Sequence, residues 1–173
     1  MFQSDVIFEQ MKNLEQEIKE IEITDSVSIS NYLCKYTELI YNYKCLGNLY
    51  DIYDDKAIIY MENGKKIIGP HDMVKEAIIF HSTFPDAKIT MVDSFAVSID
   101  DCYKVWRNYY ITGTCLGYSV YGEPTNKKLE ENNCIVLSMA TMKKIKQRYR
   151  ITQEYCMTSA ELLRNVCTKE EHI

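Results

Sequence analysis

Four long strand-like stretches fill the second half of the chain and restrict the folds open to it. They span residues 88–99, 102–115, 128–140 and 143–155, and each carries apolar residues on both faces. Asp100-Asp101 forms the first turn, and residues 116–126 form a loop that contains Gly117, Gly122 and Pro124. Since no helical stretch separates these strands, the pattern predicts an antiparallel meander.

The first half of the chain predicts helices. They cover residues 2–23 and 28–45 and a stretch from Gly69-Pro70 to just before Phe84-Pro85-Asp86, and a last helix follows at 159–167. A small hairpin, 57–61 with 66–68, turns at Asn63-Gly64. Helices followed by long antiparallel strands indicate an α+β fold, with a curved sheet packed against N-terminal helices. We expect helices to cover one face of the sheet and a second subunit to cover the other.

Residues 1–24 form an extra amphipathic helix before a domain that spans 25–173. Its apolar residues recur at alternating steps of four and three, as in a short coiled coil: Ile7, Met11, Leu14, Ile18 and Ile21. This seam packs either on its own domain, which we favour, or on the same helix of a second subunit.

Composition excludes several classes of function. The net charge is −5 and no basic stripe stands out, so we expect no nucleic-acid partner and no membrane partner. No apolar run is long enough to span a bilayer, and the first residues do not resemble a signal peptide. The seven cysteines and three histidines lack zinc spacing, so we expect no metal site and a reducing, cytoplasmic location.

Several short motifs stand in a characteristic order over about residues 30–165. They are residues 36–42 (YTELIYN), Gly69 with Phe84-Pro85-Asp86, Gly113-Thr114 with Gly117, and Pro124-Thr125. This set resembles the SnoaL-like polyketide cyclases of the nuclear-transport-factor-2-like superfamily. The resemblance implies a cone-shaped, cystatin-like α+β barrel with an internal pocket for a small, largely apolar molecule. It also implies chemistry without a metal or organic cofactor, although the wider fold includes non-catalytic binding modules.

The chain departs from the family at both of the expected catalytic positions. The family's histidine after Gly-Thr falls on Cys115, which is either a buried strand residue or a reactive or redox-sensitive thiol. The family's carboxylate in the last strand falls at Gln153 or Glu154, and we place Gln153 in the pocket lining. We expect Glu154 to be a general base if the strand register points it inward, with Glu131 on the preceding strand as the alternative.

The remaining pocket residues are predicted from strand alternation and from side-chain chemistry. Arg107 and Tyr109 share a strand face with Cys115, so an inward Cys115 implies an inward Arg107, which would need an acid or an anionic ligand as its partner. An outward, solvated Arg107 is the alternative. A tyrosine ring with its hydroxyl suits polyketide, steroid or aromatic ligands. We therefore expect further lining from Tyr36, Tyr50, Tyr53 and Tyr121.

Three functions stay open from the sequence. The first is a cofactor-free cyclase, isomerase or hydrolase that uses Glu154 or Glu131. The second is a binding module that kept the pocket and lost the catalytic groups, as Cys115 and Gln153 indicate. The third is a dimeric interaction protein that assembles through its N-terminal helix.

Overall fold

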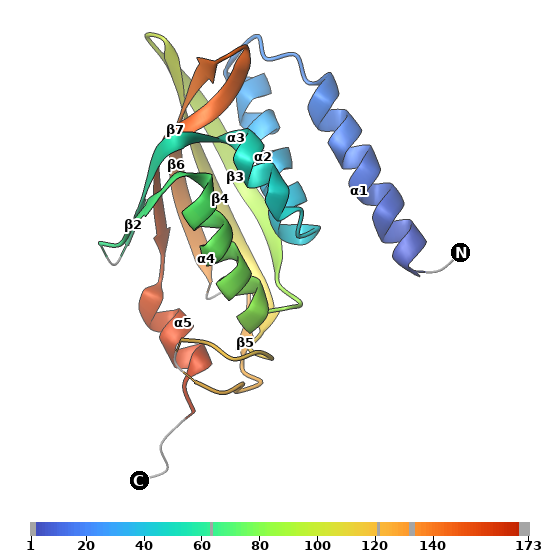
Figure 1. Cartoon of the computed structure of the whole chain (residues 1–173), viewed down its shortest axis with the longest axis vertical. Helices are drawn as coiled ribbons and strands as arrows, with labels where there is room; N and C mark the ends of the chain where they lie inside the picture. The colour runs from blue at the N-terminus through green and yellow to red at the C-terminus, as the bar shows by residue number, and fades with distance from the viewer. Residues whose placement is uncertain (1–2, 63, 121, 132–133, 170–173) are drawn as a thin grey trace.

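The computed structural model describes residues 3–62, 64–120, 122–131 and 134–169 (Figure 1). The helices are α1 (Gln3–Glu20), α2 (Ser26–Asn42), a 3₁₀ turn (Leu46–Asn48), α3 (Leu49–Ile52), α4 (Gly69–Thr83) and α5 (Ala160–Cys167). The strands are β1 (Tyr53–Met61), β2 (Lys66–Ile68), β3 (Lys88–Ile99), β4 (Cys102–Thr114), β5 (Lys128–Leu129), β6 (Ile135–Ile145) and β7 (Arg148–Thr158). The predicted order of helices and strands is present.

The strands form a strongly curled sheet in the order β2-β1-β7-β6-β4-β3, with β5 beside β4. β1 and β7 run parallel, and the other strand pairs of the described residues are antiparallel. The helices α2, α3 and α4 lie on one side of the sheet (Figure 1). This arrangement confirms the predicted α+β class with a curved sheet packed against N-terminal helices.

The prediction of one strand over residues 128–140 is wrong. The chain makes a short β5, turns, and starts β6 only at Ile135, which then continues to Ile145. Buried residues alternate along β6 beyond Ala140 to Met142, so the core keeps the strand extended there. The turn falls instead at Lys146 and Gln147, whose φ angles of 49° and 68° suit a tight hairpin turn.

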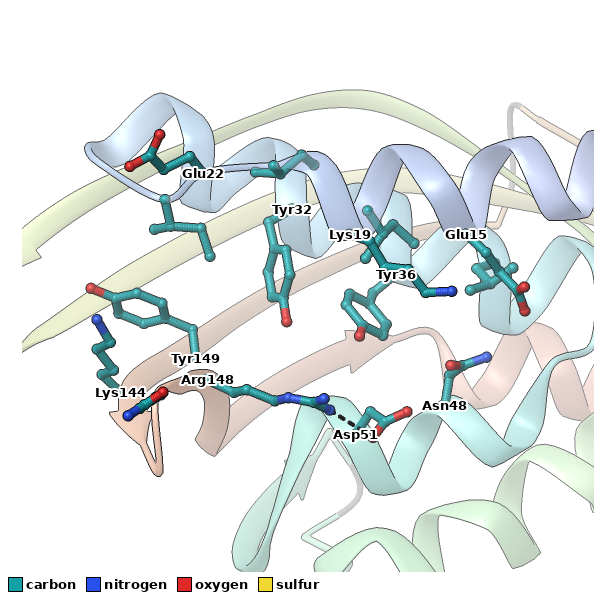
Figure 2. A pocket seen from close by; sticks show the side chains of 15 residues that line it. Glu15, Lys19, Glu22, Tyr32, Tyr36, Asn48, Asp51, Lys144, Arg148 and Tyr149 are labelled. Carbon is teal, nitrogen blue, oxygen red and sulfur yellow. Dashed lines mark hydrogen bonds and ion pairs between the residues drawn. The ribbon is translucent and has the colours of Figure 1, made fainter.

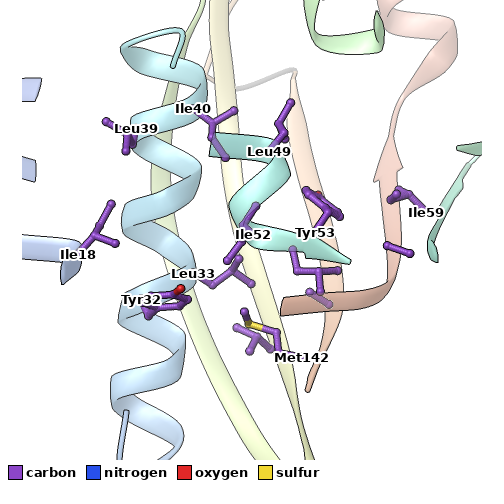
Figure 3. Close-up of a cluster of buried hydrophobic side chains, with 14 of the residues drawn as sticks. Ile18, Tyr32, Leu33, Leu39, Ile40, Leu49, Ile52, Tyr53, Ile59 and Met142 are labelled. Atoms are coloured by element: carbon purple, nitrogen blue, oxygen red, sulfur yellow. The ribbon is translucent and has the colours of Figure 1, made fainter. Parts of the chain in front are cut away.

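The main core lies between α2, α3 and the sheet (Figure 3). The helix α2 begins with a capping box, in which Asp25 accepts from the Ser28 backbone at 2.8 Å and Ser28 Oγ accepts from the Asp25 backbone at 3.0 Å. Leu33 of α2 belongs to one buried cluster with Ile52 and Met142. The cap and the apolar face together fix α2 on the concave face of the sheet.

Only part of the α1 seam is buried. Leu14 and Ile18 are buried in the main core, whereas Ile7 is 49% exposed and Phe8 is 54% exposed. The N-terminal end of α1 points away from the sheet (Figure 1). The seam therefore packs on its own domain in its second half only. None of the helices in the described residues is long and apolar enough to cross a membrane.

The convex face of the sheet is apolar and open. Phe95, Trp106, Met139, Tyr155 and Tyr60 stand side by side on five neighbouring strands. Phe95 stacks on Trp106 with ring centroids 5.0 Å apart, and Tyr60 stacks on Tyr155 at 4.9 Å. Phe95 is nevertheless 57% exposed. No helix or strand of the described residues thus covers this side of the sheet.

Candidate functional site

A cavity of about 250 Å³ lies on the concave face, between the sheet, α4 and α5. We call it the concave pocket. Apolar side chains from both layers line most of it, among them Ile59, Met61, Ala77, Phe80, Ile111 and Val136. Glu154 and Arg107 also line it and are buried, with exposures of 3% and 5%. A largely apolar cavity with a few convergent polar groups has the usual composition of a small-molecule site.

A bulge in β7 decides that Glu154 faces this pocket. Thr141 pairs with Gln153 and Met142 pairs with Ile151, so Thr152 is an extra residue on β7. Ile151 is buried on the concave face, and strict alternation from it would place Gln153 inward. The extra residue reverses the order, so Glu154 points inward and Gln153 lies on the other face, where it donates to the Tyr155 hydroxyl at 3.0 Å.

Arg107 is held inward by the regular alternation of β4. Val105, Arg107, Tyr109 and Ile111 are buried in turn along this strand. The guanidinium donates to Ser138 Oγ at 3.0 Å from Nε and at 2.7 Å from Nη2, and to Thr37 Oγ1 at 2.5 Å. Its Nη2 also forms a short contact with Glu154 Oε1. The prediction that an inward arginine needs an acidic partner is met by Glu154.

The second carboxylate oxygen of Glu154 accepts a short hydrogen bond from the Tyr53 hydroxyl. Burial raises the pKa of Tyr53 well above its ordinary value, and the charge of Glu154 raises it further. Burial alone would lower the pKa of Arg107, but Glu154, with smaller effects of Tyr109 and Tyr53, outweighs it and raises the pKa. Arg107 is therefore a permanent cation and Tyr53 a permanent hydroxyl donor at neutral pH.

Two further tyrosines, Tyr41 and Tyr109, line the same cavity. Burial is the main reason why the pKa of each lies above its ordinary value. Both therefore keep their protons and can donate to an oxygen atom of a ligand. Among the described residues, the polar end of the pocket thus combines one carboxylate, one guanidinium that balances its charge, and phenol donors.

The other predicted pocket residues lie elsewhere. Tyr50 is 46% exposed and pairs with His71 Nδ1 at 3.2 Å. Tyr36 lines a different groove, beneath α1. Glu131 is exposed in the turn before β6, outside the lining of the concave pocket, because the strand expected to carry it begins only at Ile135. Tyr121 falls outside the described residues.

Cys115 is fully buried but does not line the concave pocket. It follows the end of β4, where its backbone pairs with residues 126 and 127. Its sulfur lies 3.8 Å from the sulfur of Cys167, and Cys167 does line the pocket. The position of the family's histidine is therefore one residue layer behind the cavity wall.

Sequence reasoning missed Tyr41, Ser138, Thr37 and Cys156. The sequence did carry a signal for Ser138, because a serine at an inward position of β6, between apolar residues, needs a buried hydrogen-bond partner. Arg107 is that partner. Thr37 had none, since a helical threonine commonly bonds its own helix, as this one does to the Leu33 carbonyl at 2.8 Å.

The motifs that carried the resemblance act mainly as structural contacts. Asp86 of Phe-Pro-Asp accepts from the Thr114 backbone at 2.7 Å and from its hydroxyl at 2.8 Å, which joins two of the motifs. A Cβ on Gly117 would lie 1.7 Å from the Ser82 carbonyl oxygen, so only glycine fits there. Thr125 donates to the Val166 carbonyl of α5 at 2.6 Å. These contacts assemble the end of the pocket formed by α4 and α5.

A second groove, of about 690 Å³, lies between α1 and the turn that joins β6 and β7 (Figure 2). Its described charged groups balance in number: Glu15, Glu22 and Asp51 against Lys19, Lys144 and Arg148. Asp51 pairs with Arg148 at 3.4 Å. This groove is wide and polar and brings together no buried ionised pair, so the concave pocket is the better candidate site.

Comparison with known proteins gives the fold a name. No family model and no curated protein matches the sequence. Among solved structures, a candidate SnoaL-like polyketide cyclase from a Jannaschia species superposes with a TM-score of 0.61 at 8% identity, covering 86% of this chain and 99% of that one. Aln2 from a Streptomyces species gives a TM-score of 0.60 at 13% identity over 80% of this chain and 94% of that one.

A hexachlorocyclohexane dehydrochlorinase, LinA-type3 from Novosphingobium barchaimii, gives a TM-score of 0.60 at 11% identity over 90% of each chain. At these identities the likeness concerns the fold. The chain has a SnoaL-like, cystatin-like fold, as its sequence motifs predicted. The neighbours' differing descriptions, a cyclase and a dehydrochlorinase, agree with a fold that holds several chemistries.

Proposed function

We propose that the concave pocket binds a small, largely apolar molecule with an oxygen atom at one end, and that Glu154 moves a proton on that molecule. The observation that carries this proposal is the buried Arg107–Glu154 pair in the wall of an apolar cavity. A buried ion pair adds little to stability compared with apolar residues of similar size. Its presence at a cavity therefore favours a role in binding or chemistry.

The chemistry that suits these groups is proton abstraction next to a carbonyl. The carboxylate of Glu154 would take the proton, because each of its oxygens keeps a lone pair beyond the bond it accepts. Tyr41, Tyr53 or Tyr109 would donate to the oxygen that gains negative charge. Arg107 would position Glu154 and hold the local charge balance. Ring closure, isomerisation and elimination all share this first step.

The charge of the pocket selects the ligand class. Arg107 and Glu154 cancel, and Glu76, the other charged residue in the described lining, pairs with Lys65 at 2.6 Å, so the wall offers no unbalanced charge to a free acid or amine. A neutral ligand with one carbonyl would pack its apolar part against the apolar lining and accept a hydrogen bond from a tyrosine hydroxyl. Polyketide-like, steroid and terpenoid ketones fit this description better than aromatic acids.

A thermal-shift screen of the purified chain against those four classes tests binding, since a ligand of the native state raises the unfolding midpoint. Hits are then incubated with the protein and followed by mass spectrometry and by exchange of the ligand's α-hydrogens in D₂O. Glu154→Gln should keep binding and lose exchange by at least about 100-fold. Glu38→Gln, on the exposed side of α2, is the matched control and should keep both. Full exchange in Glu154→Gln would refute the proposed base.

A non-catalytic binding module is the second candidate. The observation that favours it is that both oxygens of Glu154 already accept hydrogen bonds, while the family's histidine position holds Cys115 behind the wall. It predicts saturable binding with no exchange and no product in the wild-type chain. The same assay therefore separates the two candidates.

We further propose that two copies associate through the convex face. Its apolar rows cross five strands, so it measures about 20 Å across and about as much along the strands. That is a flat area of about 400 Å² per partner, half of the ~800 Å² in a standard interface, so residues around this patch would have to complete the contact. Leu137→Asp should then halve the mass in light scattering, whereas deletion of residues 1–20 should not. If only the deletion lowers the mass, the exposed half of α1 mediates assembly instead.

The proposed location is the cytoplasm. The seven cysteines are free thiols in the structure. A reducing compartment keeps thiols in that form. Cell fractionation followed by alkylation of the thiols before lysis would test both the place and their state.

A further inference from the structure

Two of these thiols lie in contact at the end of the concave pocket. Cys115, directly after β4, is fully buried, and Cys167, the last residue of α5, is 3% exposed. Their sulfurs are 3.8 Å apart although 52 positions separate them in the chain. A disulfide has a bond of about 2.05 Å, so the two sulfurs need to approach by only about 1.8 Å.

One short segment holds both cysteines in place. The backbone of Cys115 donates to the Lys127 carbonyl at 2.9 Å and accepts from the Asn126 backbone at 3.0 Å. The same segment holds the end of α5, because Thr125 Oγ1 donates to the Val166 carbonyl at 2.6 Å and Lys127 Nζ to the Thr168 carbonyl at 3.1 Å. The two thiols are thus positioned by a shared clamp rather than by chance contact.

The sulfurs can approach through a movement of α5 rather than of the sheet. This helix has 8 residues and joins β7 through Ser159 alone. Cys115, in contrast, lies between β4 and the clamp segment. A small shift of α5 toward Cys115 would close the sulfur–sulfur distance without moving the sheet.

We propose that Cys115 and Cys167 are a site of reversible disulfide formation that fastens α5 across the end of the concave pocket. The inference goes beyond the proposed function, since it requires the two thiols and no ligand. Cys167 and Leu163 of α5 line the pocket, so the bond would fix one wall of it. A small oxidant reaches Cys167 through the same cavity.

With hydrogen peroxide as the oxidant the reaction balances. The Cys167 thiolate attacks peroxide, an S–O bond forms as the O–O bond breaks, and the sulfenic acid and hydroxide result; the hydroxide takes up the proton that the Cys167 thiol released and becomes the first water. The Cys115 thiolate then attacks that sulfur, the S–S bond forms as the S–O bond breaks, and hydroxide leaves and takes up a proton as the second water. Two electrons pass from the two sulfurs to peroxide.

The environment sets the rate of this step. Burial raises the pKa of Cys167 to about 11, and Cys115 beside it adds to the rise. The thiolate is the reacting form, and below that pKa its fraction grows about tenfold for each unit by which the pH rises. The structure therefore assigns a thiol pair that resists weak oxidants at neutral pH and closes faster in alkaline solution.

The test uses the full chain, freed of reductant, treated with hydrogen peroxide at pH 7 and pH 8, quenched with iodoacetamide and digested without reduction. Mass spectrometry should find the Cys115 and Cys167 peptides linked, with the loss of two hydrogens. The linked product should form about tenfold faster at pH 8 than at pH 7. Dithiothreitol should release the link. The linked form should melt on the order of 10 °C higher, because the bond joins residues 52 positions apart in the chain.

Matched variants separate this pair from the other thiols. Cys115→Ala and Cys167→Ala should each abolish the link, and Cys102→Ser, at the start of β4, should keep it. A link between other cysteines, or oxidation of Cys167 to sulfinic acid with Cys115 still open to alkylation after denaturation, would overturn the proposal. The wild-type digest decides the matter even if an alanine variant fails to fold.

Discussion

The Arg107–Glu154 pair gives a quantitative prediction of stability. Arg107→Met leaves the carboxylate buried with Tyr53 as its partner, and Glu154→Leu leaves the guanidinium buried with Ser138 and Thr37. Loss of one member of a buried pair costs about 4 kcal/mol, because the remaining charge keeps its desolvation penalty. With a urea slope of about 2.5 kcal/mol per molar, each single variant should lower the midpoint by about 1.6 M.

The double variant Arg107→Met/Glu154→Leu removes both charges and should behave differently. It still leaves the Tyr53 and Ser138 hydroxyls without their partners, which costs about 2 kcal/mol in total. Independent losses would instead sum to about 8 kcal/mol. The double variant should therefore be more stable than either single variant, with a midpoint about 0.8 M below wild type.

Equilibrium urea unfolding followed by far-ultraviolet circular dichroism measures these differences. Lys35→Met is the control, because Lys35 pairs with Glu17 on the surface and should cost less than about 1 kcal/mol. The reasoning fails if Arg107→Met costs no more than Lys35→Met. It also fails if the double variant loses as much as the sum of the singles, since the two side chains would then not interact.

Three further predictions rest on single residues. Burial, with a smaller effect of Lys44, lowers the pKa of His81 below 6.5, and both ring nitrogens are buried without a described hydrogen-bond partner. As the pH falls, the imidazole of His81 is protonated first in the unfolded chain, so its contribution to stability is complete above about pH 6.5 and is lost below it. His81→Gln should therefore make the unfolding midpoint depend less on pH between 7.5 and 5.5, and an unchanged pH dependence would count against this role. Gly117→Ala should lower the free energy of unfolding by more than about 2 kcal/mol, because its Cβ would clash with the Ser82 carbonyl oxygen. Gly47→Ala, with open space around it, should change that free energy by less than about 1 kcal/mol. Burial raises the pKa of Cys134 to about 11, so iodoacetamide followed by mass spectrometry of the Cys134 peptide should find it labelled only after urea is added, and fast labelling of Cys134 in the native chain would show that this core opens.

Much of the fold was predictable because it rests on local patterns. The stretches 88–99 and 102–115 are β3 and β4 to within one residue, since the Asp100-Asp101 turn is explicit in the sequence. The Asn63-Gly64 signal predicted the short hairpin, and Pro70 predicted the start of α4. The boundary between β6 and β7 was not predictable, because the turn at Lys146 and Gln147 lacks the usual glycine or asparagine.

The site was less accessible to sequence reasoning, because it depends on contacts between distant strands. Alternation could offer Arg107 only a choice of two faces, and the choice was made by Ser138 and Glu154 on other strands. Tyr53 was one of several equivalent tyrosines until the parallel pairing of β1 with β7 brought it beside Glu154. No local pattern distinguishes that tyrosine from Tyr50, which lies on the surface.

The bulge in β7 makes the register of that strand a chemical variable. Because Thr152 is left out of the ladder, Glu154, Cys156 and Thr158 reach the cavity, whereas regular pairing that included Thr152 would present Gln153, Tyr155 and Met157 in their place. Deletion of Thr152 would straighten the strand and leave the carboxylate facing inward. One codon inserted after Thr152, with the bulge retained, would instead exchange a carboxylate for an amide and a thiol for a phenol with no side chain rewritten, so relatives that differ by such an insertion would share an architecture and carry unrelated reagents.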